Sequence, residues 1–108
     1  MKKIIKGEIH LIPFPFTDLS KNKLRPCVVL GADLEDIVVV FMTSAKPKTR
    51  EYVLVHPSKG NGIKSISYIR YTKIATLDKK LSLGKIGVLE KELYQNVTKE
   101  LKLFLGGL

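Results

Sequence analysis

The chain has 108 residues, of which 44% are hydrophobic and 27% are charged, and its formal net charge at pH 7 is +9. This length fits a single domain over residues 1–108, and the hydrophobic content excludes an intrinsically disordered chain. A single cysteine, Cys27, excludes a disulfide-stapled scaffold. No hydrophobic run approaches membrane-spanning length and no export signal follows the basic start, so we expect a cytoplasmic protein.

The N-terminal part of the chain predicts a strand followed by a loop. Residues Gly7–Ile12 alternate in polarity, which predicts a strand with Ile9 and Leu11 on one face. His10 lies between them and is expected at the surface, pointing away from that face. Two prolines then remove backbone donors, so residues 13–23 are predicted to form an extended loop.

Two apolar runs rich in β-branched residues follow, Cys27–Leu30 and Ile37–Met42. Their continuous hydrophobicity predicts central strands of a closed or stacked sheet. The polar segment Gly31–Asp36 between them predicts a turn. Cys27 is therefore predicted to be a buried packing residue rather than a reactive thiol.

The next segment predicts a short strand, a turn and a long strand, at Tyr52–Val55, Ser58–Gly62 and Ser65–Leu77 respectively. The alternation in the long strand predicts three inward side chains, which are Ile66, Tyr68 and Ile74.

The C-terminal part changes to helical periodicity. Apolar residues recur at four-residue spacing, at Leu89, Leu93, Val97, Leu101 and Phe104/Leu105. The pair Gly106-Gly107 supplies a stop signal for this helix. Short strands followed by one helix predict a mainly β fold, a small barrel or folded sheet covered by the helix.

The positive charge is concentrated in residues 45–80. This segment holds nine basic and two acidic residues, which leaves +7 of the net charge of +9. A basic surface attracts polyanions and accelerates their encounter with the protein. The expected partners are therefore nucleic acid or an acidic protein segment.

Several short sequence patterns occur in order over residues 6–105. They are Lys6–Ile9, Pro13–Asp18, Leu24–Leu30, Val40–Ser44, Gly62–Ile63 with Ser67, Ile74–Lys79 and Gly87–Leu89. Together they resemble the MazF/PemK-like toxins, which begin with Gly-Asp/Glu-Ile, carry Arg-Pro before an apolar strand and end a strand with Thr-Ser. The resemblance implies an SH3-like barrel, a homodimer and cleavage of single-stranded RNA without cofactors. It also implies a cognate antitoxin whose acidic C-terminal segment covers the RNA groove.

Arg25 and Thr43 are the candidate catalytic residues. RNA carries its own nucleophile, the 2′-OH, so an enzyme need only orient it, stabilise the phosphorane and move protons. Arg25 suits the stabilising and proton-donating role because its planar guanidinium binds phosphate oxygens through two N–H groups. Thr43 supplies a neutral hydroxyl, and Ser44 supplies another or caps the following turn.

Further residues are candidates for accessory roles or RNA binding. Asp18 is the accessory acidic residue, and Phe14 and Phe16 flank prolines where single-stranded bases could stack. The remaining candidates are Lys23, Lys46, Lys48, Ser67 and Arg70.

The sequence also permits other interpretations of these residues. An Arg-Pro before a strand and a Thr-Ser after one also occur as ordinary loop chemistry. His10 and His56 suggest an acid/base pair, although a surface histidine without a role is commoner. We expect no metal site, because the sequence has one cysteine, two distant histidines and no acidic cluster beyond Asp33–Asp36, which predicts a hairpin turn. The alternatives are a non-catalytic RNA- or protein-binding barrel and a gyrase-directed toxin of the same fold.

Overall fold

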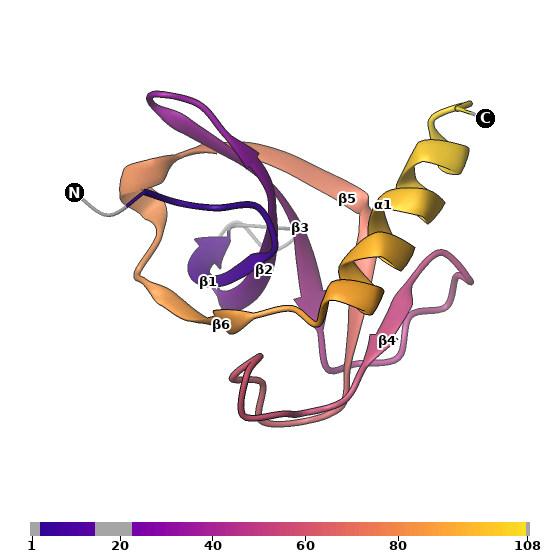
Figure 1. The fold of residues 1–108 in the computed structure, drawn as a ribbon. Helices are drawn as coiled ribbons and strands as arrows, with labels where there is room; N and C mark the ends of the chain where they lie inside the picture. Colours follow the sequence, from indigo (N-terminus) through magenta and orange to yellow (C-terminus); the bar gives the residue numbers. More distant parts are fainter. Residues whose placement is uncertain (1–2, 15–22, 108) are drawn as a thin grey trace.

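The computed structural model describes residues 3–14 and 23–107, apart from the side chains of Phe14 and Lys23. Within these ranges the chain forms one antiparallel sheet in the order β4-β5-β3-β2-β1-β6, with one α-helix beside it (Figure 1). The elements are β1 (Glu8–Phe14), β2 (Lys23–Ala32), β3 (Asp36–Thr43), β4 (Val53–Val55), β5 (Ser67–Asp78), the 3-10 helix η1 (Lys79–Leu81), β6 (Lys85–Val88) and α1 (Lys91–Phe104). The sheet curls into a half-barrel, which confirms the predicted mainly β, SH3-like fold with a C-terminal helix.

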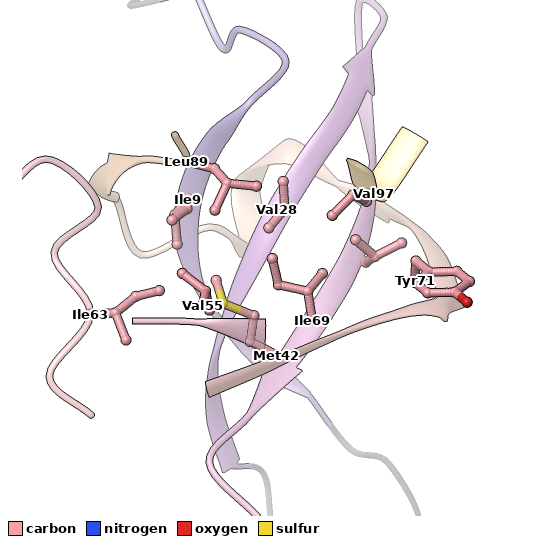
Figure 2. Close-up of a cluster of buried hydrophobic side chains, with 10 residues drawn as sticks. Ile9, Val28, Met42, Val55, Ile63, Ile69, Tyr71, Leu89 and Val97 are labelled. Carbon is pink, nitrogen blue, oxygen red and sulfur yellow. The ribbon is translucent and has the colours of Figure 1, made fainter. Parts of the chain in front are cut away.

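The central strands β2 and β3 are buried on both faces, as their continuous apolar sequences predict. Successive side chains point to opposite faces of a strand, so these strands feed two separate clusters. The first cluster lies between the sheet and α1 and includes Val28, Met42 and, from the helix, Val97 (Figure 2). The second cluster lies on the opposite face. Its buried members are Ile12, Cys27, Val29, Ile37, Val39 and Phe41.

Cys27 is fully buried in the second cluster, as predicted. Burial raises the pKa of its thiol to about 12, against the smaller opposing effect of the Arg25 charge. The thiol therefore stays protonated at neutral pH and acts as a packing residue rather than a nucleophile.

The turn between β2 and β3 is the predicted hairpin, and Asp33 holds it closed. The Asp33 carboxylate accepts hydrogen bonds from the backbone N–H groups of Glu35 at 2.9 Å and Asp36 at 2.7 Å. The backbone N–H of Asp33 donates to the Asp36 carbonyl at 2.9 Å. The acidic residues here therefore serve the turn.

The predicted loop over residues 13–23 is wrong at both ends, because β1 continues through Pro13 and β2 begins at Lys23. Leu11 exchanges backbone hydrogen bonds with the segment that precedes β6. The nitrogen of Pro13, two residues later, points to this same edge of β1. Among the described residues, no strand pairs with β1 along that edge at Pro13. Proline is tolerated at such an edge because no sheet hydrogen bond is lost. Residues 15–22 of the predicted loop lie outside the described residues.

The prediction of which side chains of β5 point inward is also wrong. Ile69 and Tyr71 are the residues that enter the first cluster (Figure 2). Ile66 and Ile74 are exposed, and Tyr68 is half-buried. Pairing with β3 decides which face of β5 turns inward, and a shift of register in this pairing breaks the alternation before Ile74.

The helix α1 packs against β4 and β5 (Figure 1) and buries the centre of its predicted apolar stripe. Val97 is fully buried, whereas Phe104 and Leu105 at the end of the stripe are more than half exposed. The half-buried members of the stripe are Leu93 and Leu101. The helix ends at Phe104, just before the predicted stop signal, where Gly106 has a φ of 90°. Within the described ranges, α1 is too short and too polar to cross a membrane.

The predicted turn before β5 rests on β6 and is anchored by a buried asparagine. The Asn61 side-chain oxygen accepts hydrogen bonds from the backbone N–H groups of Ser58 and Ile63, each at 3.0 Å. Gly62 has a φ of +69°, and a Cβ at this position would lie 2.1 Å from the Ile86 carbonyl oxygen. Only glycine fits this close approach, which fixes the position of the segment before β5 against β6.

Candidate functional site

Arg25 of β2 and Thr43 of β3 lie side by side at the ends of two adjacent strands. The Arg25 guanidinium donates a hydrogen bond to the Thr43 hydroxyl at 3.2 Å. The same hydroxyl accepts one from the backbone N–H of Ala45, also at 3.2 Å. The guanidinium carbon lies 5.6 Å from the centre of the Phe41 ring, within cation–π range. These contacts give the cation and the hydroxyl a defined mutual orientation.

A cleft of about 440 Å³ contains this pair. One wall comes from β1, β2 and β3, and the other comes from the segment before β5 and from β6. The lining residues are Leu11, Leu24, Arg25, Pro26, Met42, Thr43, Ser44, Gly62, Ile63, Lys64, Ser65, Ser67 and Ile86. The cleft thus combines apolar walls with one cation–hydroxyl pair, several further hydroxyls and one lysine, a composition typical of ligand sites.

The predicted accessory serines both line the cleft, but their surroundings differ. Ser44 is exposed next to Thr43. Ser67 is 5% exposed, and its hydroxyl donates to the Ser65 carbonyl at 2.9 Å. Ser67 therefore already has a structural role, which holds the chain where it enters β5.

The remaining predicted site residues lie outside the cleft or outside the described part of the chain. Lys46 and Lys48 are exposed beyond the end of β3, and Arg70 is half-buried on β5 opposite Phe41. The backbones of Phe14 and Lys23 pair where β1 ends and β2 begins, and their side chains are not described. Asp18 and Phe16 lie outside the described residues.

The basic side chains of residues 45–80 are available to a partner. Among the described residues, the ion pairs join Glu8 to His10 and to Lys85, and none involves this segment. Unneutralised cations at the surface attract polyanions most strongly at low salt.

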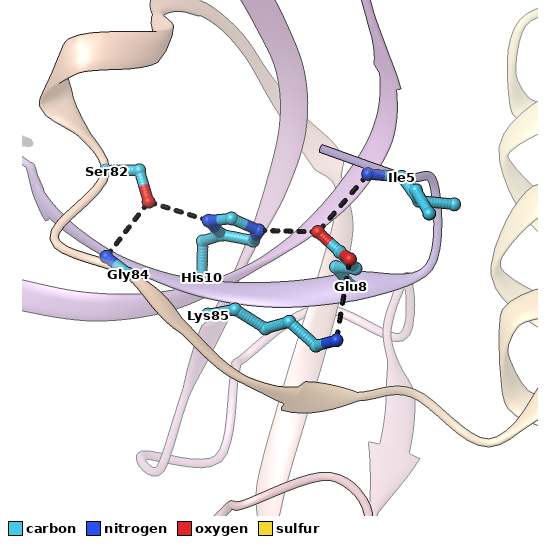
Figure 3. A network of polar contacts seen from close by, with 6 residues as sticks. All are labelled: Ile5, Glu8, His10, Ser82, Gly84 and Lys85. Atoms are coloured by element: carbon cyan, nitrogen blue, oxygen red, sulfur yellow. Dashed lines mark hydrogen bonds and ion pairs between the residues drawn. The ribbon is translucent and has the colours of Figure 1, made fainter. Parts of the chain in front are cut away.

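His10 is buried, so its expected place at the surface is wrong. Its side chain lies in a polar network at 5% exposure (Figure 3). Its two ring nitrogens lie 2.6 Å from the Ser82 hydroxyl and 2.9 Å from a Glu8 carboxylate oxygen. The Lys85 ammonium reaches the other Glu8 oxygen at 3.6 Å. The network ties β1 to the segment before β6, and His10 is not among the residues that line the Arg25 cleft.

Sequence reasoning missed two residues that line the cleft and one that contacts Arg25. Lys64 and Ser65 precede β5, and only the fold brings them into the same cleft as Arg25. Phe41 lies beneath the guanidinium, and its position two residues before Thr43 is the signal that could have found it. No group of three or more His, Cys, Asp or Glu side chains suited to a metal ion occurs in the described ranges.

Comparison with known proteins gives a consistent result. A family model for PemK-like, MazF-like toxins of type II toxin–antitoxin systems matches residues 5–105. Among solved structures, MazF (Form-I) from Deinococcus radiodurans has a TM-score of 0.79 at 15% identity, over 98% of this chain and 99% of that one. The Mycobacterium tuberculosis toxin MazF-mt6 has a TM-score of 0.75 at 17% identity, over 93% and 97% of the two chains.

A third similar structure is an endoribonuclease in complex with its cognate antitoxin from a mycobacterial species. It has a TM-score of 0.76 at 16% identity over 96% of each chain. No curated protein sequence matches the chain. At these identities the structural matches establish the shared fold, while the family match rests on the sequence itself.

Proposed function

Because the chain belongs to the PemK-like, MazF-like toxins of type II toxin–antitoxin systems, we propose that it is an endoribonuclease that cuts single-stranded RNA at specific sequences without a metal ion. The observation that carries this proposal is the hydrogen-bonded pair of Arg25 and Thr43 in the cleft. Two similar structures from mycobacterial species, both named as endoribonucleases, support the same class of activity.

The chemistry uses the 2′-OH of the RNA as the nucleophile. This oxygen loses its proton to solvent as it attacks the adjacent phosphorus in line, and the bond to the 5′-oxygen of the next nucleotide breaks. Protonation of that 5′-oxygen leaves a 2′,3′-cyclic phosphate and a 5′-OH. Arg25 stabilises the negative charge that develops on the phosphorane and can donate a proton to the leaving 5′-oxygen. Thr43 donates its hydroxyl to a phosphate oxygen while its own oxygen continues to orient Arg25.

The surroundings of the pair suit a single-stranded polyanion. Lys64 lines the same cleft, and Lys46 and Lys48 extend the positive surface beyond β3. These cations attract the phosphate backbone regardless of its sequence. The apolar walls of the cleft can receive unstacked bases, which a duplex does not expose.

Two protein partners follow from this proposal. An antitoxin with an acidic C-terminal segment would bind the same basic surface and block it, and two similar structures are named as MazE–MazF complexes. A second copy of the chain would complete the RNA groove as a homodimer. The exposed end of α1, where Leu103, Phe104 and Leu105 lie, leaves apolar surface for such contacts.

Incubation of the purified protein with RNA in excess EDTA tests the activity. We expect cyclic-phosphate ends on single-stranded RNA and no cleavage of DNA of the same sequence, because DNA lacks the 2′-OH. Activity that disappears in EDTA and returns with magnesium would contradict the metal-free mechanism. Tight RNA binding with no cleavage under any condition would identify a non-catalytic binding barrel instead.

A further inference from the structure

The face of the sheet opposite α1 carries an aromatic residue next to the Arg25–Thr43 pair. Tyr68 of β5 lies directly opposite Thr43 of β3 in the antiparallel register. Residues that face each other in this way project from the same side of the sheet, with Cβ atoms about 4.5–5.5 Å apart. Arg25, Thr43 and Tyr68 therefore form one row across three adjacent strands.

The ring of Tyr68 is not used by the hydrophobic core. Ile69 and Tyr71 occupy the core side of β5, whereas Tyr68 is half-buried on the other side. The Tyr52 ring lies 5.1 Å from it, centre to centre, at an interplanar angle of 88°. In this edge-to-face arrangement Tyr52 covers at most one face of the Tyr68 ring and restrains its orientation.

Two arginines lie near this aromatic pair in the chain. Arg70 lies two residues after Tyr68 and so projects from the same face, opposite Phe41. Its Nε atom is buried and has no hydrogen-bond partner. Buried polar groups without a partner are rare in native proteins, and a phosphate oxygen would supply the acceptor that this Nε–H lacks. Arg50 is exposed two residues before Tyr52.

We propose that Tyr68 stacks one unpaired base of the RNA beside the phosphodiester held by Arg25 and Thr43, while Arg70 binds a phosphate of the adjoining backbone. This inference rests on the proposed function, because it takes single-stranded RNA as the ligand. Stacking depends on the flat face that every base has, so Tyr68 strengthens binding at one nucleotide position with little preference for its identity. Tyr68 is thus a binding and positioning residue, and Arg25 remains the group that acts on the phosphorane.

The test is a scan of single abasic sites through a short 2′-O-methyl RNA, which cannot be cut because its nucleophile is blocked. Affinity is measured for the wild-type chain and for Tyr68→Leu and Tyr68→Phe. We expect one position where removal of the base weakens wild-type binding about 5- to 150-fold, the range for one stacked base. Tyr68→Phe should keep this loss and Tyr68→Leu should abolish it. Tyr94→Leu, which changes a half-buried tyrosine on α1, is the matched control and should keep it.

A second measurement does not depend on any variant being folded. The base at the identified position is replaced by 2-aminopurine, whose fluorescence falls on stacking, and the wild-type protein should quench it more strongly than at neighbouring positions. If no position shows an abasic loss, or Tyr68→Leu keeps the loss, or no position is quenched, the stacking proposal is overturned.

Cleavage of unmodified RNA is measured in parallel, so that the two proposals can fail separately. Normal cleavage with no Tyr68-dependent position overturns the stacking proposal alone. A Tyr68-dependent position without any cleavage supports the stacking surface and contradicts the nuclease. If Tyr68→Leu weakens binding of an acidic antitoxin peptide but leaves RNA affinity unchanged, the surface belongs to the antitoxin and the proposal is overturned.

Discussion

Replacement of Arg25 by alanine separates transition-state stabilisation from simple attraction of RNA. In the structure Arg25 is fixed by the Thr43 hydroxyl at 3.2 Å and by the Phe41 ring at 5.6 Å. A charge so oriented is suited to stabilise the phosphorane, and loss of one such donor typically lowers a rate about 100- to 1,000-fold. We therefore expect Arg25→Ala to lower the saturated single-turnover rate about 100-fold or more, equivalent to roughly 2.7 kcal/mol in activation free energy.

Lys64 is the matched control, because it places a second positive charge in the same cleft. Its side chain is exposed and makes no hydrogen bond or ion pair with another described residue. Lys64→Ala should weaken RNA binding at all sequences and make the salt dependence of affinity shallower by roughly 0.7, the value for one contact to a single strand. Its saturated cleavage rate should match that of the wild-type chain.

The assay pairs two measurements on each variant: affinity for an uncleavable RNA at several salt concentrations, and the single-turnover rate at saturating protein. Thr43→Val has almost the same shape and removes only the hydroxyl, so it should also lose rate while remaining folded. Arg25→Ala loses at least the hydrogen bond to Thr43 and the contact with the Phe41 ring, about 1–2 kcal/mol of stability, which a thermal melt reports. If Arg25→Ala binds weakly but cuts at the normal rate once saturated, Arg25 is only a phosphate anchor. Asp18 is then the first residue to examine.

Three further predictions concern stability and assembly. Burial raises the pKa of the Glu8 carboxyl, but the hydrogen bonds from His10 and the Ile5 N–H, with the Lys85 charge, outweigh it and lower the pKa below its usual 4.5. Ionised Glu8 therefore stabilises the fold fully above pH 4.5 and loses this effect as pH falls below that value. Denaturation at several pH values should show that Glu8→Gln lowers the free energy of unfolding less and less as pH falls. A difference between the two chains that does not change with pH would refute this. Gly62→Ala should lower the free energy of unfolding by at least about 1–2 kcal/mol, whereas Gly60→Ala, whose added Cβ meets no atom within 4 Å, should leave the melting temperature nearly unchanged. Light scattering at micromolar concentration should give twice the chain mass of 12.1 kDa, and a strict monomer that still cuts RNA efficiently would contradict the homodimer.

The central strands and the helix are the parts of the fold that sequence patterns determine well. The runs around Val28 and Val40 are short, apolar at every position and rich in β-branched residues, a combination that favours a strand buried on both faces. Asp33 predicts the turn between them, because its carboxylate can accept hydrogen bonds from the backbone N–H groups two and three residues later. Val97 marks the helix face because the four-residue spacing leaves only one side apolar. In each case the signal is contained within a few neighbouring residues.

The face of β5 that turns inward was not predictable from the same kind of pattern. Around Tyr68 both alternating sets contain large apolar or aromatic residues, so periodicity favours neither. The pairing of Ile69 with Met42, 27 positions earlier, decides the matter. The burial of His10 has a similar cause, because its partner Ser82 is separated from it by 72 positions. Contacts between residues far apart in the sequence therefore determine which side chains turn inward where local alternation does not.

The candidate catalytic pair was predicted by resemblance, and the structure supplies a physical reason for its geometry. Arg25 and Thr43 are 18 positions apart, but β2 and β3 pair with Cys27 opposite Phe41. Each candidate lies two residues beyond that pair, on the same face of the sheet and towards the same end. The opposite wall of the cleft depends on the Gly62 turn, and its approach to Arg25 could not be read from the sequence.

The arrangement of the sheet separates stability from the proposed chemistry. Met42 of β3 points towards α1 and belongs to the first cluster, and Phe41 belongs to the second, whereas Thr43 at the end of the strand is a member of neither cluster. The pairing of β2 with β3 ends at Cys27 and Phe41, and the side-chain hydrogen bond between Arg25 and Thr43 links the two strands beyond that point. Substitutions at these two positions should therefore change reaction rate more than stability. Substitutions at Val28 or Val97 should do the reverse, because they leave a cavity between the sheet and the helix.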